Sequence, residues 1–385
     1  MIELCGNNNK YQLGKISNTE IMYSSFTITP VHSSFDISSI SSLSICGDHS
    51  VAIIKNGTIL ATGNNNKGEI YPSIPQVTLT GFTSFEIRDE HNNLLHPISA
   101  SCGYNFTVYL VSLEKGSNEN RLALSYSYIK TDTPLFLNTG KSNPVALFSG
   151  FTKAAAIDSD GKVLFDLHTF SEKRTTQLEA VSLPDGDKAV KVACCSVSFF
   201  VLGLSGRLFE VEPDEFELEF NEVEELHGEK IVDVSGIYDH CLALTENGTV
   251  FGFGSNKYGK LGLGENIEET SVFTEISSLN QITAVCAGTN HSLFQTSEGK
   301  VFACGYNKFG ELFTDSPTED VLTPIEVKLK GKATFCIAGD SKSAIFIGHD
   351  PINSPNHLIG IQKVESAQNK TELRDEKLNF INKEK

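Results

Sequence analysis

The amino-acid sequence predicts an all-β protein: a seven-bladed β-propeller whose ring is closed by pairing the N-terminal strand with the C-terminal repeat. Three observations predict this fold. A pattern of glycine turn, apolar run and hairpin turn returns at intervals of roughly 50 residues, which is typical of propeller blades. The apolar runs have the length of strands, and no amphipathic helix is evident before residue 360. The last repeat also lacks its second half, which is found at the start of the chain.

The first half of each repeat is a glycine turn followed by an apolar run and a second turn. The clearest copies are CGDHSVAIIKNGTIL (46–60), SGIYDHCLALTENGTVF (235–251) and AGTNHSLFQTSEGKVF (287–302). Asn-Gly and Asp-Gly pairs after the apolar runs are typical of β-hairpins. Weaker copies complete a set of seven anchor positions, which are Gly47, Gly103, Gly150, Ser196, Gly236, Gly288 and Gly339.

The second half is an apolar strand followed by Gly-x-Asn, as in VFGFGSNKYGKLGLG (250–264) and VFACGYNKFGELF (301–313). The segment GSNKYGKLG at 254–262 lacks only the Ser or Thr of a phosphate-binding loop. The next copy, however, has Glu311 at the place of Lys260, and a phosphate cradle would not accept that exchange. We therefore interpret the repeated glycines and asparagines as structural turn residues. They are Gly6, Asn8, Gly63, Asn65, Gly254, Asn256, Gly305 and Asn307.

The seventh repeat stops after SAIFIGHD (343–350), and IELCGNNNKYQLG (2–14) supplies the missing strand and Gly-x-Asn turn. Pairing these two segments would close the ring and remove its open edges. We expect a propeller over residues 1–348. Residues 349–385 leave the repeat and predict a polar C-terminal tail, weakly helical or disordered.

Composition excludes several classes of protein. The net charge of −17 disfavours binding to nucleic acid through charge. No signal peptide is evident, and no run approaches the ~20 apolar residues of a membrane helix. Nine cysteines without a CxxC pair predict a reducing compartment and no zinc site. Cys5 and Cys304 share one repeat position, and Cys46 and Cys102 another, so we expect buried packing residues. We expect a cytoplasmic or nucleocytoplasmic monomer without cofactor, metal or membrane contact.

The two signatures together resemble the regulator of chromosome condensation repeat. The resemblance covers about residues 2–348; it is strong at 1–70 and 235–350 and weak between 110 and 230. It implies a propeller that has no covalent chemistry of its own. The founding member of the family is the exchange factor for the small GTPase Ran, and other members are interaction domains. One plant branch senses ultraviolet-B through tryptophans, a role excluded here because the chain contains none.

The resemblance also implies that the turn between the first two strands of a repeat faces the GTPase. The candidate partner-binding residues are Asp48, His49, Asn105, Asp239, His240, Asn290, His291 and Ser341. The alternative for the three histidines is that they stabilise their own loops through hydrogen bonds. They come from repeats 1, 5 and 6, which a ring would hold far apart, so a shared metal site is not expected.

Two functional hypotheses remain open. The first is a noncatalytic interaction propeller that acts as an exchange factor or binder for a Ran-like small GTPase. The second is a scaffold or adaptor without exchange activity in trafficking, cytoskeletal or ubiquitin pathways. The loop at 114–121 is either a partner-contacting wedge or an excursion without function. The acidic stretch at 210–229 is either a patch for a basic partner or a blade edge charged against strand addition.

Overall fold

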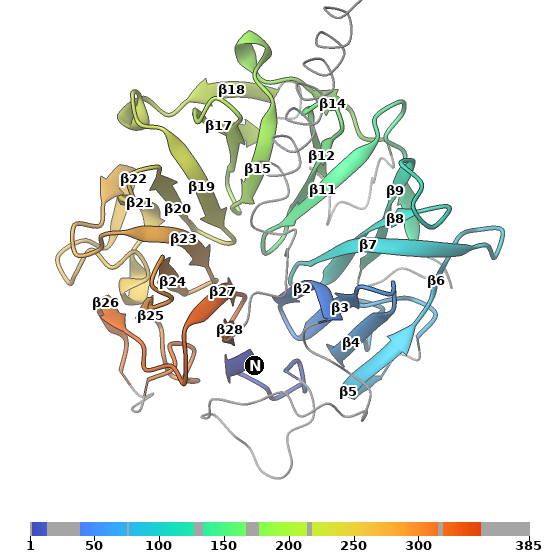
Figure 1. Ribbon diagram of the computed structural model, residues 1–385, viewed down its shortest axis with the longest axis horizontal. Helices are drawn as coiled ribbons and strands as arrows, with labels where there is room; N and C mark the ends of the chain where they lie inside the picture. Colours follow the sequence, from blue (N-terminus) through green and yellow to red (C-terminus); the bar gives the residue numbers. More distant parts are fainter. Residues whose placement is uncertain are drawn as a thin grey trace, which may run out of the picture.

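The computed structural model describes residues 2–13, 39–74, 77–126, 134–166, 177–213, 218–314 and 319–347. These residues form seven antiparallel sheets arranged as a ring around a central axis (Figure 1). The predicted seven-bladed propeller is therefore confirmed. The predicted tail at 349–385 lies outside the described residues.

Each blade is one sheet, and in five of the seven blades the strands follow one another outward from the axis in chain order. Blades 1 and 2 contain β2 (Ile40–Cys46), β3 (His49–Ile54), β4 (Ile59–Asn64), β5 (Thr78–Phe85), and then β6 (Ile87–Arg88), β7 (Leu94–Cys102), β8 (Phe106–Ser112), β9 (Asn120–Tyr126) and β10 (Leu135–Leu137). Blades 3 and 4 contain β11 (Pro144–Ser149), β12 (Ala154–Asp158), β13 (Val163–Asp166), β14 (Ala180–Val181), and then β15 (Ala189–Cys194), β16 (Phe199–Gly203), β17 (Leu208–Pro213) and β18 (Leu218–Glu222).

The remaining blades repeat this order. Blades 5 and 6 contain β19 (Ile231–Gly236), β20 (His240–Thr245), β21 (Val250–Ser255), β22 (Glu269–Glu275), and then β23 (Ile282–Ala287), β24 (His291–Thr296), β25 (Val301–Gly305) and β26 (Val321–Glu326). Blade 7 contains β27 (Ala333–Ala338), β28 (Lys342–Ile347) and β1 (Ile2–Gly6). Among the described residues, three short 3₁₀ segments lie in the connections, at η2 (Pro184–Gly186), η3 (Glu224–Leu226) and η4 (Lys257–Gly259).

The hydrophobic core lies between neighbouring blades. Neighbouring blades cover both faces of the strand next to the innermost one, so every residue of β8, β12, β16, β20 and β28 is buried. Strands buried on both faces read as continuous apolar runs, which is why these segments carried the repeat signal. In one cluster Phe200 of blade 4 packs with Val234 and Cys241 of blade 5. All nine cysteines are free and buried, as predicted for the two recurring pairs.

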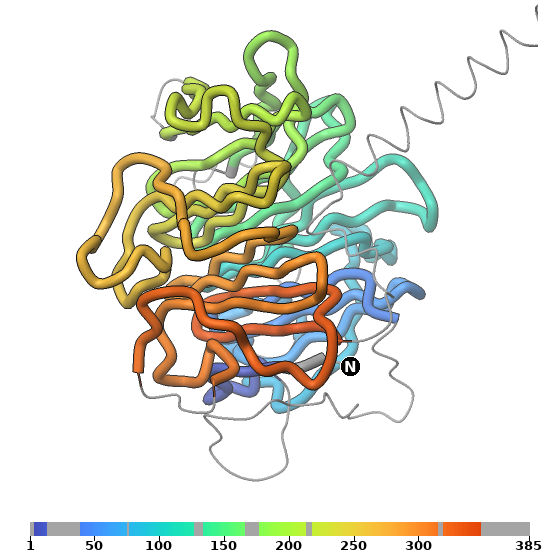
Figure 2. The backbone as a smooth tube through the Cα atoms, turned by 60° about the vertical axis from the view of Figure 1, so that its left-hand side comes forward, coloured from blue at the N-terminus to red at the C-terminus, as the bar shows by residue number. Residues whose placement is uncertain are grey.

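The ring closes between the two ends of the propeller, as predicted. β1 pairs antiparallel with β28, with Ile2 opposite Phe346 and Gly6 opposite Lys342. In Figure 2 the dark-blue N-terminal strand lies beside the orange-red strands of blade 7. Leu4 of β1 is 3% exposed and shares a cluster with residues of blades 1 and 7. The first strand of the chain thus completes the last blade.

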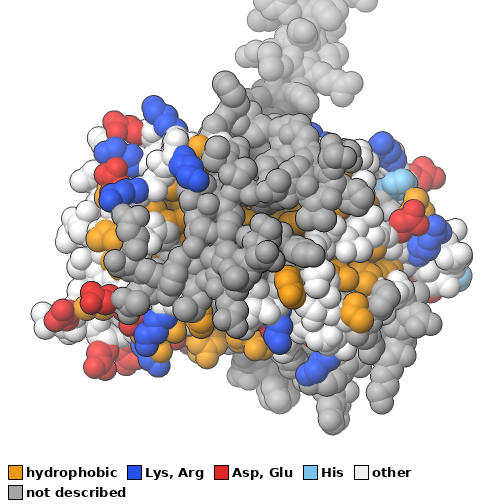
Figure 3. All heavy atoms as spheres, turned by 90° about the horizontal axis from the view of Figure 1, so that it is seen from below, with side chains coloured by type: hydrophobic (Ala, Val, Ile, Leu, Met, Phe, Trp, Pro, Cys, Tyr) orange, Lys and Arg blue, Asp and Glu red, His pale blue; other side chains and the backbone are white. Residues whose placement is uncertain are grey.

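Charged side chains cover the outer rim. On the side of the ring seen in Figure 3, acidic and basic side chains lie next to one another at both ends of the view. The described part of the acidic stretch includes β18, the outer strand of blade 4, where Glu219 is exposed and Phe220 packs against the core. This arrangement favours the interpretation as a blade edge charged against strand addition.

We predict that replacing Leu4 by alanine weakens ring closure. Deleting a buried leucine side chain typically costs about 2–5 kcal/mol, and here the cost falls on the strand that completes blade 7. Leu113→Ala is the matched control, because Leu113 is 43% exposed. Urea denaturation of both variants measures the difference. Equal stabilities would contradict a closing role for β1, as would a chain that lacks residues 2–10 and melts at the wild-type temperature.

Candidate partner-binding face

The turns between the first and second strands of the blades gather on one side of the ring, which we call the turn face. The first strands line the central channel and all run in one direction, so their ends meet at the same mouth. Backbone hydrogen bonds link several of these turns directly. Tyr104 N donates to Phe151 O over 2.8 Å, and Thr289 N donates to Gly339 O over 3.0 Å.

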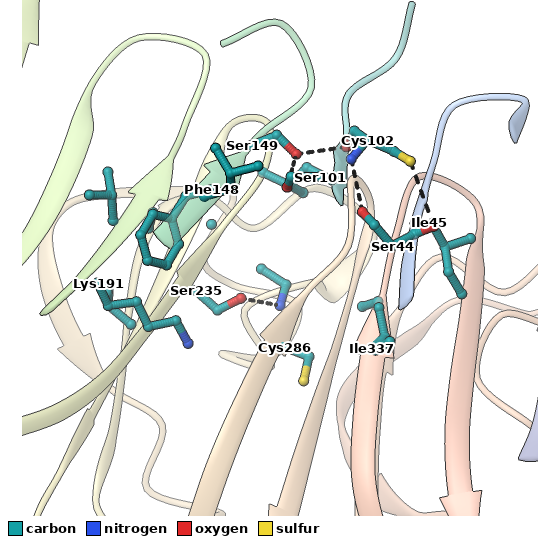
Figure 4. A pocket seen from close by; sticks show the side chains of 18 of the residues that line it. Ser44, Ile45, Ser101, Cys102, Phe148, Ser149, Lys191, Ser235, Cys286 and Ile337 are labelled. Carbon is teal, nitrogen blue, oxygen red and sulfur yellow. Dashed lines mark hydrogen bonds between the residues drawn. The ribbon is translucent and has the colours of Figure 1, made fainter. Parts of the chain in front are cut away.

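The central channel beneath this face is a narrow cavity of about 130 Å³ (Figure 4). Its polar side chains are committed to bonds between blades. Ser149 Oγ of blade 3 donates to Cys102 O of blade 2 over 2.8 Å. Ser235 Oγ accepts a hydrogen bond from the next blade. Lys191 of blade 4 forms a buried ion pair with Asp233 of blade 5. The polar groups of the channel therefore bind one blade to the next. The candidate partner-binding site is the turn face.

The anchor glycines allow neighbouring blades to approach closely at this face. A Cβ atom added to Gly150 would fall on the backbone oxygen of Cys194 in blade 4, and one on Gly339 would fall on that of Ile45 in blade 1. At Gly288 it would fall on the ring of His291. No residue with a side chain fits such contacts without moving the backbone. Glycine at these anchors therefore permits close packing of the blades, although blade 4 has Ser196 at the same position.

The three predicted histidines lie between blades and are at most 1% exposed. The Nε2 atom of each lies within hydrogen-bond distance of a hydroxyl on the next blade. The pairs are His49 with Thr107 (2.8 Å), His240 with Ser292 (3.1 Å) and His291 with Ser343 (2.8 Å). These are direct bonds from blade 1 to 2, 5 to 6, and 6 to 7.

The direction of two of these bonds follows from the hydroxyl groups. Thr107 Oγ1 donates to Glu69 O over 3.0 Å, and Ser292 Oγ donates to Lys260 O over 2.6 Å. A hydroxyl has one hydrogen, so each must accept from the histidine. His49 and His240 therefore carry the proton on Nε2. Burial in this neutral form lowers the pKa of His49 and of His291 to about 3, and nearby Lys342 adds to the effect.

This placement corrects both predictions for the histidines. A side chain at most 1% exposed cannot contact a partner at the surface, so His49, His240 and His291 are not partner-binding residues. The alternative of hydrogen bonds within their own loops is also wrong, because the partner hydroxyls lie on the next blade. Lysines form hydrogen bonds to the next blade in two other blades. Lys342 Nζ donates to Gly47 O, and Lys153 Nζ donates to Val197 O over 2.8 Å.

The other five predicted residues lie in the turns and are partly exposed. They are Asp48, Asn105, Asp239, Asn290 and Ser341. Asp239 forms an ion pair with Lys260, whose side chain is completely buried, so this carboxylate is held in a fixed position. Burial lowers the pKa of Lys260, and the Asp239 carboxylate opposes that shift. Sequence reasoning missed this pair, as well as the exposed side chains of Tyr104, Val197 and Tyr238 in the same turns.

The repeated Gly-x-Asn residues shape the loops after the third strands and after β1. Gly6, Gly63, Gly254 and Gly305 all have positive φ, between 92° and 111°. Each asparagine accepts a backbone hydrogen bond from the residue five positions later, over 2.8–3.2 Å. The pairs are Asn8 with Leu13, Asn65 with Ile70, Asn256 with Leu261, and Asn307 with Leu312. These hydrogen bonds determine the shape of the loops. Lys260 lies in one of these loops and forms an ion pair with Asp239.

Comparison with known proteins agrees with this geometry. Two models of the regulator of chromosome condensation (RCC1) repeat match the chain, one over residues 247–295 and one over 231–260 and 282–311. The human regulator of chromosome condensation is 30% identical over 122 residues, which are 31% of this chain and 29% of that protein. The human probable E3 ubiquitin-protein ligase HERC3 is 29% identical over 169 residues, 38% of this chain and 16% of that protein. The chain thus covers less than a third of either relative.

Among solved structures, yeast (Saccharomyces cerevisiae) Prp20p superimposes with a TM-score of 0.70 at 14% identity, over 97% of this chain and 94% of that one. At this identity the likeness establishes the fold. The structure is a seven-bladed β-propeller, and the RCC1 repeat models match within its blades 5 and 6. The chain is an RCC1-like propeller. Within the residues that the structure describes, no helix has the length and apolar character needed to cross a membrane.

We predict that His291 makes the protein less stable in acid. The imidazole has a pKa of about 3 when folded and its ordinary value of 6.5 when unfolded, so between these values only the unfolded chain takes up the proton. Its contribution to stability is therefore lost as the pH falls from 6.5 to 3. His291→Gln can still hydrogen-bond to Ser343 but has no titrating group. The free energy of unfolding of this variant should therefore change less between pH 6.5 and 3. The exposed His91→Gln is the control, and identical slopes for both variants would refute the assignment.

We predict that Asp239→Ala lowers stability, because it leaves the buried Lys260 ammonium without its ion-pair partner. The cost should be about 1–3 kcal/mol, since Asp239 is partly solvent-exposed. Lys260→Met removes the charge, so the double variant should regain most of the loss. Chemical denaturation of the wild type, both single variants and the double variant measures the coupling. Additive effects would show that the ion pair does not stabilise the turn.

Proposed function

We propose that this protein is a noncatalytic interaction propeller whose turn face binds a Ran-like small GTPase and speeds release of its nucleotide. The observation that carries the proposal is the partly exposed set Asp48, Asn105, Asp239, Asn290 and Ser341, placed around one mouth of a rigid ring. The RCC1 repeat resemblance implies GTPase contact through this turn, which supports the proposal. Yeast Prp20p, which has the same fold, has been studied for its binding to Gsp1p and histones.

Nucleotide exchange by such a face needs no covalent step. A surface that binds the nucleotide-free GTPase more tightly than the loaded form lowers the free energy of the empty state and so speeds release. Polar groups fixed before binding lose little entropy when the partner arrives. Asp239, held by the buried Lys260, has this property. We propose that the protein acts as a monomer in the cytoplasm or in both cytoplasm and nucleus.

A second candidate function is a scaffold without exchange activity. One observation favours it: the turns of blades 2, 4 and 5 carry exposed apolar side chains, namely Tyr104, Val197 and Tyr238. A face of mixed character suits partners other than a GTPase. The match to HERC3, a probable ubiquitin-protein ligase, supports such a role in a larger pathway.

We predict that the double variant Asp48→Ala/Asn290→Ala slows exchange about tenfold, since two lost polar contacts cost about 1–3 kcal/mol together. Release of fluorescent GDP from a panel of small GTPases that includes Ran measures the rate. Asp239 is left unchanged because its loss would unpair Lys260. The control is Ser297→Ala/Glu298→Ala, an exposed pair in the β24–β25 hairpin.

The outcomes separate the two candidates. Acceleration by the wild type and control, with loss in the Asp48/Asn290 variant, supports exchange through the turn face. Acceleration that the variant retains would refute the role of these residues. A wild-type protein that accelerates no member of the panel would refute exchange and favour the scaffold.

A further inference from the structure

Four apolar side chains form a continuous cluster on the turn face, which we call the aromatic patch. It comprises Tyr104, Phe151, Val197 and Tyr238, from the turns of blades 2, 3, 4 and 5. Val197 is 73% exposed, Tyr104 39% and Tyr238 37%. They are three of the ten exposed large apolar side chains among the described residues, and the half-buried Phe151 of blade 3 lies in the turn between those of Tyr104 and Val197. Clustered exposure of this kind marks an interaction surface.

The rings of the patch are fixed against one another. Tyr104 stacks on Phe151 with ring centroids 4.4 Å apart, and Tyr238 meets Phe151 edge to face at 5.0 Å. The backbone holds them as well. Phe151 N donates to Ile237 O over 2.7 Å, which joins blade 3 to blade 5 past blade 4, and Ser196 N donates to Tyr238 O over 2.5 Å. A partner would therefore meet a surface already in its binding shape, at little cost in side-chain entropy.

The charge beside the patch is negative. Asp239 follows Tyr238 directly. Burial raises the pKa of the Tyr104 hydroxyl, the carboxylates of Asp48 and Asp340 raise it further, and Lys67 opposes them. Three lysines of this face are engaged in the protein. Lys260 pairs with Asp239 and is buried, Lys342 is buried on the Gly47 carbonyl, and Lys153 is bound to the Val197 carbonyl. With a net charge of −17 on the chain, a basic partner is attracted.

We propose that the aromatic patch anchors a protein segment that carries an apolar or aromatic side chain next to an arginine or lysine. The apolar side chain packs on the rings and Val197, and the cation reaches Asp48 or Asp239. Arginine suits this position best, because its planar group stacks on tyrosine while it pairs with a carboxylate. The inference rests on the turn face being the partner-binding face of the proposed function, but it does not require exchange activity.

The test uses the full chain and three fluorescein-labelled peptides of eight residues. One alternates arginine with phenylalanine and leucine, one replaces the arginines by glutamates, and one replaces the apolar residues by alanine. Fluorescence anisotropy at physiological salt measures binding. The wild type should bind the first peptide at least tenfold more tightly than either of the others. Equal binding of the first and third peptides would show that charge alone accounts for the interaction, and this result would overturn the proposal.

The matching protein variant is Val197→Ser/Tyr238→Ser, which removes apolar surface without changing the charge. It should weaken binding of the first peptide about tenfold. The control Val77→Ser/Val272→Ser alters two valines that are 48% and 45% exposed and should bind like the wild type. Thermal melting checks that each variant is folded. If the double variant unfolds, Val197→Ser alone keeps the test open. Unchanged peptide binding in a folded variant would refute the aromatic patch as the anchor.

The GDP-release assay on the same proteins separates this inference from the proposed function. Exchange that persists in Val197→Ser/Tyr238→Ser, together with unchanged peptide binding, would overturn the aromatic patch and leave the proposed function intact. Peptide binding that depends on the patch, with no exchange on any small GTPase, would support the patch and overturn the exchange factor.

Discussion

The structure depends on how closely neighbouring blades approach at the turn face. Glycine anchors such as Gly150 and Gly339 let the backbone of one blade touch the next. Buried histidines then donate across the gap to hydroxyls, as His49 does to Thr107. These contacts fix the angle between blades and the positions of the turns. Because these buried contacts fix the backbone of the turns, the outward-facing side chains of the turns can vary without disturbing the ring.

Much of the fold could be predicted from the sequence, since buried middle strands and hairpin turns recur with one period even in the weak region from 110 to 230. Ring closure followed from an incomplete last repeat. The role of the histidines could not be predicted, because a turn position does not reveal whether a side chain points outward or toward the next blade. His240 and Asp239 are adjacent in sequence, yet one is buried and the other partly exposed.

The turn face combines two chemical surfaces on one scaffold. Blades 1, 6 and 7 present polar turns with Asp48, Asn290 and Ser341, and blades 2 to 4 present Tyr104, Phe151 and Val197. Blades 2 and 5 carry both characters, since Tyr104 is adjacent to Asn105 and Tyr238 to Asp239. Such a division suits a partner with one apolar and one basic side, bound in a single orientation. Relatives that share the ring can therefore differ in partner through a few turn residues.

Pairing of β1 with β28 has a consequence for biosynthesis. The ribosome makes β1 before the other strands of the propeller, but its neighbour β28 emerges roughly 340 residues later, about 20–70 s at typical rates of synthesis. Forming a β-hairpin takes only about 1–10 μs, so translation, not strand pairing, determines when the ring can close. During that delay the N-terminal strand is an unpaired apolar segment, exposed to chaperones and to other nascent chains.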